Sequence, residues 1–403
     1  MIRFQNNKLT LKIRWKYQIN LKLLKIKNMS NKEIEQLLNE TSWPCVSVIV
    51  PVHKLSPERI KNKKVVKEAI SDVEMLLKQN DAISDSDLNM LIQKLDEAVE
   101  TIDFNHSNKG IGIFVSPNLM KIIQFPFPVI EKINVGNIFE SRDLIFYLNY
   151  TTPYYVLSIG KKHIRLFSGK VEDLHEIKNE DFPIVYHETY EYSKPSKGSS
   201  FGYSLKHFEK DKSALQEIRL IDFFSAADHL LEKYLNRHIP LVISGGKKEV
   251  ADYLDITKHG KNIIGKIIGN YDSYENLKLS NLSWETVQKY FNEEQKTLLS
   301  NLHELIGNEM LAFGLEEVWL AASEGKGLEL IVEKDFRKHA FIATDGSDIK
   351  LKKPFGKKQY NHEYDAVEKV IRMVREKKGK IAFVDNSAME DFNGIALQLR
   401  YNN

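Results

Sequence analysis

The sequence alternates short runs of β-branched and apolar residues with longer segments in which apolar residues recur every three or four positions. The first run, at residues 46–52, reads VSVIVPV, and similar runs recur at 110–116, 154–159, 241–246 and 328–333. Runs of this length are typical of buried strands, whereas the longer spacing is typical of amphipathic helices. The alternation predicts an α/β fold, and the strand–helix–strand order over residues 241–269 favours a mixed or parallel sheet there.

The chain has 403 residues, which is more than one hydrophobic core normally organises. The middle of the chain holds a polar, turn-rich segment, which is followed by a helix predicted from about residue 211 to about residue 236. We predict a basic leader at residues 1–28 and three consecutive α/β domains, at residues 29–150, 151–275 and 276–403, with a loop in the second domain at 194–208.

Composition excludes two classes of protein. No stretch approaches the roughly 18 consecutive apolar residues that a membrane-spanning helix needs. A content of 42% hydrophobic and 28% charged residues is typical of a globular chain, not of a disordered one. The single cysteine, Cys45, cannot by itself form an internal disulfide or a thiolate zinc site. We therefore expect a protein of the reducing cytoplasm that contacts no membrane.

The leader differs sharply in charge from the rest of the chain. Residues 1–28 carry eight basic residues and no acidic one, and subtracting these eight from the 58 basic residues leaves 50 against 55 acidic ones, a net charge of −5. Met29 is followed by SNKEIEQLL, in which Ser30 is suited to cap a helix. Two interpretations are open: Met29 is the true start of the protein, or the leader is a basic arm for nucleic acid or a membrane surface.

Sequence motifs of common catalytic and cofactor sites are absent. The chain contains no P-loop, no HExxH, no paired CxxC and no GxSxG. His163, His175 and His187 are spaced by twelve residues, but this spacing crosses a hairpin and loops, so hydrogen-bonded or solvated histidines are the better interpretation. We predict no metal and no cofactor.

The segment IKLKKPFGKKQY, at residues 349–360, is dense in lysine and carries two aromatic residues. Lysines can neutralise phosphates while an aromatic ring stacks on an unpaired base. A solvated surface loop without a ligand is the alternative. The candidate RNA-binding residues are Lys350, Lys352, Lys353, Phe355, Lys357, Lys358 and Tyr360.

The order of these segments resembles the archaeal and eukaryotic peptide-chain release factors and their Pelota relatives, in a divergent bacterial branch. VSVIVPVHK followed by KGIGIFVSP resembles their first domain, YYVLSIGKKHIRLFSG with IPLVISGG the second, and FGLEEVWLAASEGKGLELIVE with KIAFVDNSAMEDFNGIALQLRY the third. The resemblance spans about residues 45–403. It implies three domains and a cytoplasmic, RNA-binding partner of the ribosome and its rRNA, and it leaves a translational GTPase open as a further partner.

The catalytic tip of that family is a Gly-Gly-Gln loop before the long helix, where the glutamine helps position water against the peptidyl-tRNA ester. By its distance to the helix, FGYSLKHF at residues 201–208 resembles that loop in position. A phenol at the glutamine position cannot present the paired donor and acceptor of a carboxamide, and a Cβ at the first glycine position restricts the backbone. We therefore expect a tip that binds without hydrolysing, through Phe201, Gly202, Tyr203, Ser204, Lys206 and His207, with a ligand-free surface loop as the alternative.

Three functions remain open. The first is a ribosome-associated factor that acts in a tRNA-like pose in rescue, hibernation, quality control or another stress response. The second is a peptidyl-tRNA or other RNA-ester hydrolase that uses Tyr203 and His207, and the third is a protein-interaction scaffold unconnected with RNA. The charge of −5 counts against the first, because ribosome binders usually carry a positive footprint. Stop-codon reading is not expected, because KNKK at 61–64 stands where the eukaryotic factors have Asn-Ile-Lys-Ser.

Overall fold

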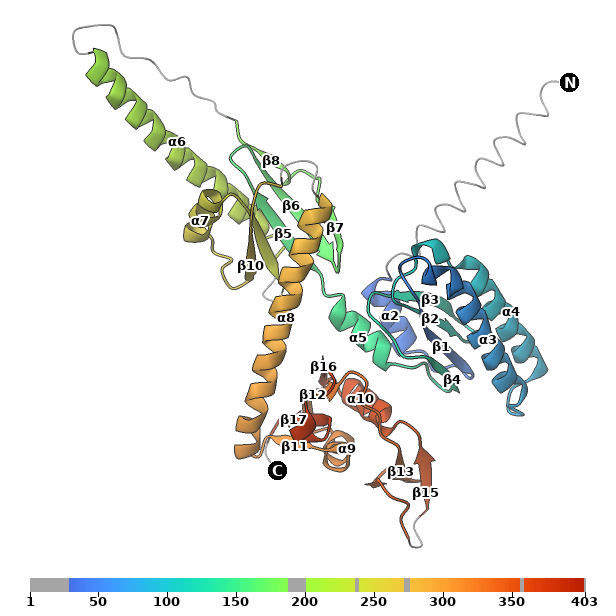
Figure 1. Cartoon of the computed structure of the whole chain (residues 1–403). Helices are drawn as coiled ribbons and strands as arrows, with labels where there is room; N and C mark the ends of the chain where they lie inside the picture. Colours follow the sequence, from blue (N-terminus) through green and yellow to red (C-terminus); the bar gives the residue numbers. More distant parts are fainter. Residues whose placement is uncertain (1–28, 188–200, 236–238, 272–275, 356–358, 402–403) are drawn as a thin grey trace, which may run out of the picture. The chain divides into compact units, whose positions relative to one another are not determined.

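The computed structural model describes residues 29–187, 201–235, 239–271, 276–355 and 359–401, apart from the side chains of residues 201–213 and Asn276 (Figure 1). The chain divides into two compact units. Unit 1 combines the residues up to Asn149 with Leu305–Asn403, and unit 2 comprises Tyr150–Glu304.

The first part of unit 1 is an antiparallel sheet in the order β3-β2-β1-β4. Its strands are β1 (Cys45–Pro51), β2 (Gly110–Val115), β3 (Met120–Phe125) and β4 (Lys132–Gly136). Its helices are α2 (Asn31–Leu38), α3 (Asn62–Lys78), α4 (Asp85–Thr101) and α5 (Arg142–Tyr150). Alternate residues of β1 pack with the apolar stripes of α3 and α4, because successive side chains of a strand point to opposite faces.

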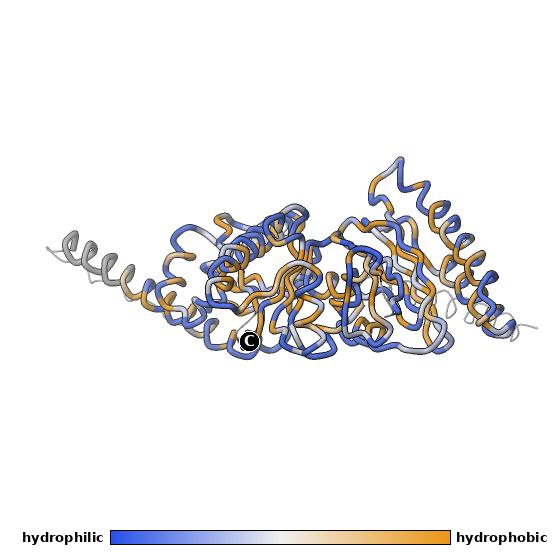
Figure 2. Tube along the Cα trace, turned by 90° about the horizontal axis from the view of Figure 1, so that it is seen from below, coloured by the Kyte–Doolittle hydropathy of each residue, from blue (hydrophilic) through white to orange (hydrophobic). Residues whose placement is uncertain are grey.

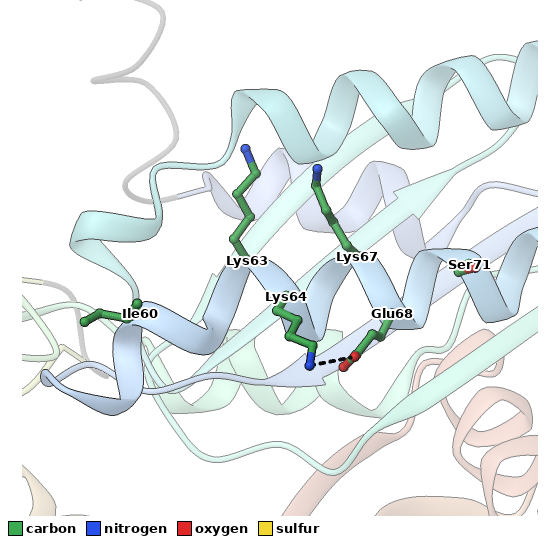
Figure 3. A pocket seen from close by; sticks show the side chains of 6 residues that line it. All are labelled: Ile60, Lys63, Lys64, Lys67, Glu68 and Ser71. Atoms are coloured by element: carbon green, nitrogen blue, oxygen red, sulfur yellow. Dashed lines mark ion pairs between the residues drawn. The ribbon is translucent and has the colours of Figure 1, made fainter.

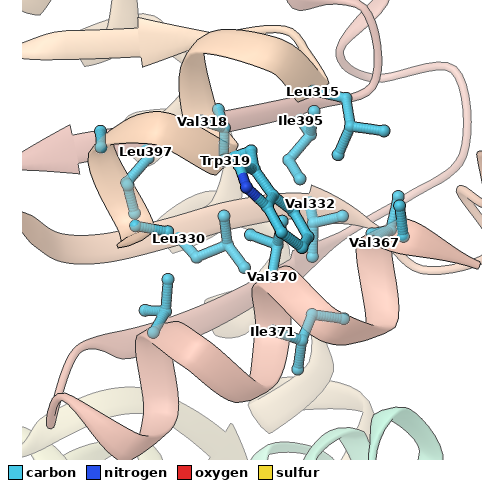
Figure 4. Close-up of a cluster of buried hydrophobic side chains, with 14 of the residues drawn as sticks. Leu315, Val318, Trp319, Leu330, Val332, Val367, Val370, Ile371, Ile395 and Leu397 are labelled. Carbon is cyan, nitrogen blue, oxygen red and sulfur yellow. The ribbon is translucent and has the colours of Figure 1, made fainter. Parts of the chain in front are cut away.

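The second part of unit 1 holds two sheets, in the orders β11-β17-β12-β16 and β14-β13-β15. Helices α9 (Leu315–Glu324) and α10 (Ala366–Glu376) share a core with the strands around the buried Trp319 (Figure 4). Gly325 ends α9 with φ at +79°, a left-handed conformation that favours glycine. The strands are β11 (Leu311–Phe313), β12 (Gly327–Glu333), β13 (Ala340–Ala343), β14 (Ile349–Lys350), β15 (Tyr360–Glu363), β16 (Lys380–Val384) and β17 (Ile395–Leu399).

Unit 2 is built on a mixed sheet in the order β10-β9-β5-β6-β7, with β8 on β6. β5 pairs with β6 in an antiparallel hairpin and with β9 in parallel. The strands are β5 (Tyr154–Ile159), β6 (His163–Lys170), β7 (Asp173–Glu176), β8 (Ile184–Val185), β9 (Leu241–Gly245) and β10 (Ile263–Ile268). The helices are α6 (Phe201–Leu231), α7 (Lys247–Ile256) and α8 (Asn276–Gly307).

Both units combine helices with β-sheets, which confirms the predicted α/β class. The division into three domains stays a prediction, because residues up to 149 and residues 305–403 are grouped in one compact unit. Hydrophobic and hydrophilic residues are interleaved along the described helices (Figure 2), and none of these helices is long and apolar enough to cross a membrane.

Candidate functional site

Residues 201–208, which we compared with the Gly-Gly-Gln loop, form the start of a helix. Phe201 is the first residue of α6, so the helix begins ten residues before the predicted position. Residues 203–213 contain neither glycine nor proline, and they include leucine, lysine and glutamate, which favour helix. The loop prediction is therefore wrong for residues 201–208, and residues 194–200 lie outside the described part of the chain.

The N-terminal half of α6 projects from the packed part of unit 2 (Figure 1). Among the α6 side chains that are described, Leu220 is the first that packs on the core, whereas Leu215 and Ile218 are 43% and 58% exposed. At 1.5 Å per residue, the helix axis from residue 201 to residue 220 is about 28 Å long.

The predicted tip residues therefore lie at the far end of a long helix. They are Phe201, Gly202, Tyr203, Ser204, Lys206 and His207. Their side chains are outside the described residues, so their role in binding stays a prediction.

The other half of α6 is held by the carboxylate of Asp228, which is buried. This carboxylate accepts hydrogen bonds from the hydroxyls of Tyr253 at 2.7 Å and Thr257 at 2.6 Å, and from the backbone N–H of Lys258 at 3.0 Å. Hydrogen bonds to a charged acceptor are among the stronger ones in proteins. Asp228 thus fixes α6 to the end of α7, and we interpret it as a structural group.

The segment between β14 and β15, residues 351–359, is called the lysine loop below. It connects the two outer strands of the sheet β14-β13-β15. The hydroxyl of Tyr360 donates to Asp348 at 2.8 Å, and the ammonium of Lys350 lies 3.3 Å from the same carboxylate. This hydrogen bond raises the pKa of Tyr360 and lowers that of Asp348. The structure therefore brings Lys350 and Tyr360 to one carboxylate, although they are ten positions apart.

Three residues in the described part of the lysine loop face solvent. Lys352, Lys353 and Phe355 are all exposed. Lys357 and Lys358 lie outside the described residues. The loop thus presents an exposed ring among exposed ammonium groups, and its role in RNA binding stays a prediction.

A shallow depression of about 530 Å³ lies at the N-terminal end of α3 (Figure 3). Lys64 pairs with Glu68 at 3.5 Å, and Lys63 pairs with Glu100 at 3.3 Å, outside the depression. These exposed pairs contribute little to stability. The depression includes residues of the KNKK segment, and it is lined by Ile60, Lys63, Lys64, Lys67, Glu68 and Ser71.

A buried cluster of charges joins the two parts of unit 1. The guanidinium of Arg142 donates to the carbonyl of Phe336 and to both carboxylate oxygens of Asp365, at 3.0 and 3.3 Å. It also lies 3.7 Å from Glu368, which accepts hydrogen bonds from the backbone N–H and the hydroxyl of Ser141 at 2.8 and 2.5 Å. Asp365 caps α10, where the helix dipole favours negative charge. We interpret this cluster as a structural contact that holds the two parts of unit 1 together.

Glu140 lies beside that cluster. Burial, together with the charge of Glu368, raises the pKa of Glu140 to about 7. Its carboxylate accepts a hydrogen bond from the amide of Asn134 at 3.0 Å. The next acidic residue, Asp143, forms a buried ion pair with Lys132.

The three equally spaced histidines are not brought together as metal ligands. His175 lies 3.2 Å from Asp173, and His163 and His187 are exposed. Within the described ranges, no three His, Cys, Asp or Glu side chains are grouped so that they could hold a metal ion.

Sequence reasoning missed a set of rings that adjoin the lysine loop. They are His339, Phe341, His362 and Tyr364, on or next to β13 and β15. Strand alternation over 339–343 and 360–364 was the signal that could have placed them on one face.

A protein-family model matches the middle of the chain. Residues 153–326 match the family model "Bacterial archaeo-eukaryotic release factor family 3". No curated protein matches the chain.

The solved structures to which this chain is similar include two archaeal proteins and one yeast protein. The archaeal translation termination factor aRF1 is 13% identical over 93% of this chain and 99% of its own, with a TM-score of 0.23. Pelota of Archaeoglobus fulgidus is 15% identical over 70% and 76%, with a TM-score of 0.35. Dom34 of S. cerevisiae, a translation termination-like factor, is 13% identical over 73% and 80%, with a TM-score of 0.39.

The matched residues include the whole of α6 and its projecting end. Residues 153–326 are thus similar to the bacterial archaeo-eukaryotic release factors, which confirms the superfamily resemblance predicted from the sequence.

Proposed function

We propose that this protein is a cytoplasmic, ribosome-associated translation factor that binds in a tRNA-like pose. It acts in rescue, hibernation or quality control and does not hydrolyse peptidyl-tRNA. The observation that carries the proposal is the family match over residues 153–326, in a chain whose sequence contains no Gly-Gly-Gln motif.

We propose the absence of hydrolysis because the chain lacks the glutamine of that motif. A glutamine amide carries its donors and its acceptor on separate atoms, whereas the hydroxyl of Tyr203 donates and accepts through one oxygen at the end of a rigid ring. The long projection of α6 supports a role in reaching into a recess, because about 28 Å of helix separates residue 201 from the core of unit 2.

The uneven distribution of charge supports RNA binding through local groups of lysines. Residues 29–403 carry a net charge of −5, but lysines gather in the segment 349–360 and along the first turns of α3. Affinity for RNA follows the number of phosphates that are neutralised, so clustered lysines serve even in a chain of negative net charge.

Sucrose-gradient sedimentation of lysates from growing and starved cells tests the proposal. We expect the protein in ribosomal fractions at low salt, and we expect RNase treatment to release it. Lys352→Glu combined with Lys353→Glu should weaken the association. Absence of the unmodified protein from ribosomal fractions in both growth states would refute the proposal.

Peptide release from ribosome-bound, labelled peptidyl-tRNA distinguishes the factor from a hydrolase. We expect no release by the unmodified protein. Release by the unmodified protein, abolished in Tyr203→Phe or His207→Ala, would instead establish the hydrolase. A translational GTPase stays a predicted further partner, to be sought by affinity purification with and without nuclease.

A further inference from the structure

The three-stranded sheet β14-β13-β15 has one face in the core and one face toward solvent. Ala340, Ile342 and Ile349 belong to the core, with exposed fractions of 0%, 7% and 3%. Alternate residues of a strand point to opposite faces. The outer face therefore carries Phe341 and the buried Ala343 of β13, Lys350 of β14, and Tyr360 and His362 of β15. His339 and Tyr364 adjoin this face just beyond the ends of β13 and β15.

Four of these outer residues form a continuous group of rings. Phe341 is paired in register with Lys350 on one side and with His362 on the other. The ring of His362 lies 5.0 Å from Phe341, 5.9 Å from His339 and 4.7 Å from Tyr364, between ring centroids. Tyr364 is 83% exposed as a residue, and both histidines are exposed. The group therefore offers flat, polarisable ring surfaces to a partner.

Positive charge lies on either side of the rings. Lys338 precedes β13, and Lys352 and Lys353 follow β14; all three are exposed, and none has an acidic partner among the described residues. The exposed ring of Phe355 continues the aromatic surface into the lysine loop. The nearby acidic residues are occupied, since Asp348 contacts Lys350 and Tyr360, and Glu363 pairs with Lys369.

We infer that this face binds single-stranded RNA, whose unpaired bases stack on His339, Phe341, His362 and Tyr364 while the flanking lysines contact phosphates. Rings on an open sheet, bordered by cations, match the chemistry of unpaired nucleotides, because every base has a π-face and every link a negative charge. A duplex hides its base faces and offers only phosphates and groove edges to such a surface. The inference rests on the proposed function in that both require RNA as the partner.

Fluorescence anisotropy with the purified full chain tests the inference. The probe is a labelled 12-nucleotide single strand of mixed sequence, compared with the same strand in an RNA duplex. We expect tighter binding of the single strand. His362→Ala combined with Tyr364→Ala should weaken this binding by roughly 5-fold or more, the loss typical of one removed base stack.

Three matched variants separate stacking from charge and from general damage. Tyr364→Phe keeps the ring and should bind as the unmodified protein does. Tyr401→Ala removes a ring that is 54% exposed elsewhere in unit 1 and should change nothing. Lys352→Ala with Lys353→Ala should weaken the single strand and the duplex alike, and should reduce the dependence of affinity on salt by about one to two counterions.

The results separate this inference from the proposed function. Unchanged single-strand affinity in the His362/Tyr364 variant, or equal affinity for strand and duplex, would overturn the inference while ribosome co-sedimentation could still stand. Loss of single-strand binding in that variant supports the inference even if the protein is absent from ribosomal fractions. A nuclease-insensitive protein partner that is lost in the same variant, without any RNA binding by the purified chain, would also overturn it.

Discussion

Replacing Arg142 with methionine tests whether the buried charges fasten the two parts of unit 1. The Arg142 side chain is only 3% exposed and pairs with Asp365 at 3.0 Å and with Glu368 at 3.7 Å. Methionine occupies much of the arginine stem but leaves both carboxylates, which are 24% and 13% exposed, without this cation. Burial already raises the pKa of Asp365 against the opposing effect of Arg142.

Removing one partner of a buried ion pair typically costs about 3–5 kcal/mol, because an uncompensated charge stays buried. Asp365 is partly exposed and keeps Arg337 at 3.8 Å, so we expect the lower end, about 3 kcal/mol. With a urea m-value of about 2 kcal/mol/M, the midpoint of unfolding should fall by about 1.5 M. Circular dichroism and tryptophan fluorescence both report the transition, and Trp319 lies in the core of the same unit.

A neutralised variant supplies the control. Arg142→Met combined with Asp365→Asn and Glu368→Gln also removes the two carboxylate charges that lose their partner, while it keeps side chains of similar shape. We expect it to recover at least half of the lost stability, because apolar or neutral replacements of a buried ion pair are often well tolerated. A loss below about 1 kcal/mol in the single variant, or no recovery in the neutralised one, would refute the reasoning.

Three further changes probe other contacts by urea unfolding. The pKa of Glu140 is raised to about 7 from 4.5, so the folded state holds this proton more tightly and its stability falls as pH rises from about 4.5 to about 7. Glu140→Gln should be more stable than the unmodified protein at pH 8 and equal to it near pH 4; a pH-independent difference would contradict this. Gly169→Ala should destabilise by about 1–3 kcal/mol, because the new Cβ would lie 2.3 Å from the buried ring of Tyr154, and unchanged stability would argue against that packing. Ser30→Ala should cost about 1 kcal/mol by removing the cap of α2, and Ser30→Asp should retain it; equal loss in both would exclude the cap as the cause.

The buried strands were the most predictable part of the fold. Runs at 46–52, 241–246 and 328–333 correspond to β1, β9 and β12, because a strand buried on both faces needs consecutive apolar residues. The start of α6 was not predictable in the same way. Phe201, Leu205 and Phe208 recur at helical spacing, but the glycine at 202 and the polar, turn-rich residues before it read as a turn when no helix boundary is known.

The candidate surfaces show the same limit. The lysine loop was visible in the sequence because its charges are contiguous. The ring group was not, because His339 and His362 become neighbours only once β13 pairs with β15. Arg142 and Asp365 are 223 positions apart, and nothing local in either segment indicates the other. Contacts that depend on pairing or docking therefore need the structure.

The length of the projecting half of α6 determines both the distance of residue 201 from the core and the direction of its side chain. Each residue of an α-helix adds 1.5 Å and turns the direction of the next side chain by about 100°. Seven residues make almost two complete turns, so removing seven from the projecting half would shorten the reach by about 10 Å and rotate the tip by only about 20°. Removing two would shorten it by about 3 Å and point residue 201 to nearly the opposite side. The number of residues removed thus sets how far the tip extends from the core. The part of a turn that this number leaves over sets the direction in which the side chain of residue 201 points.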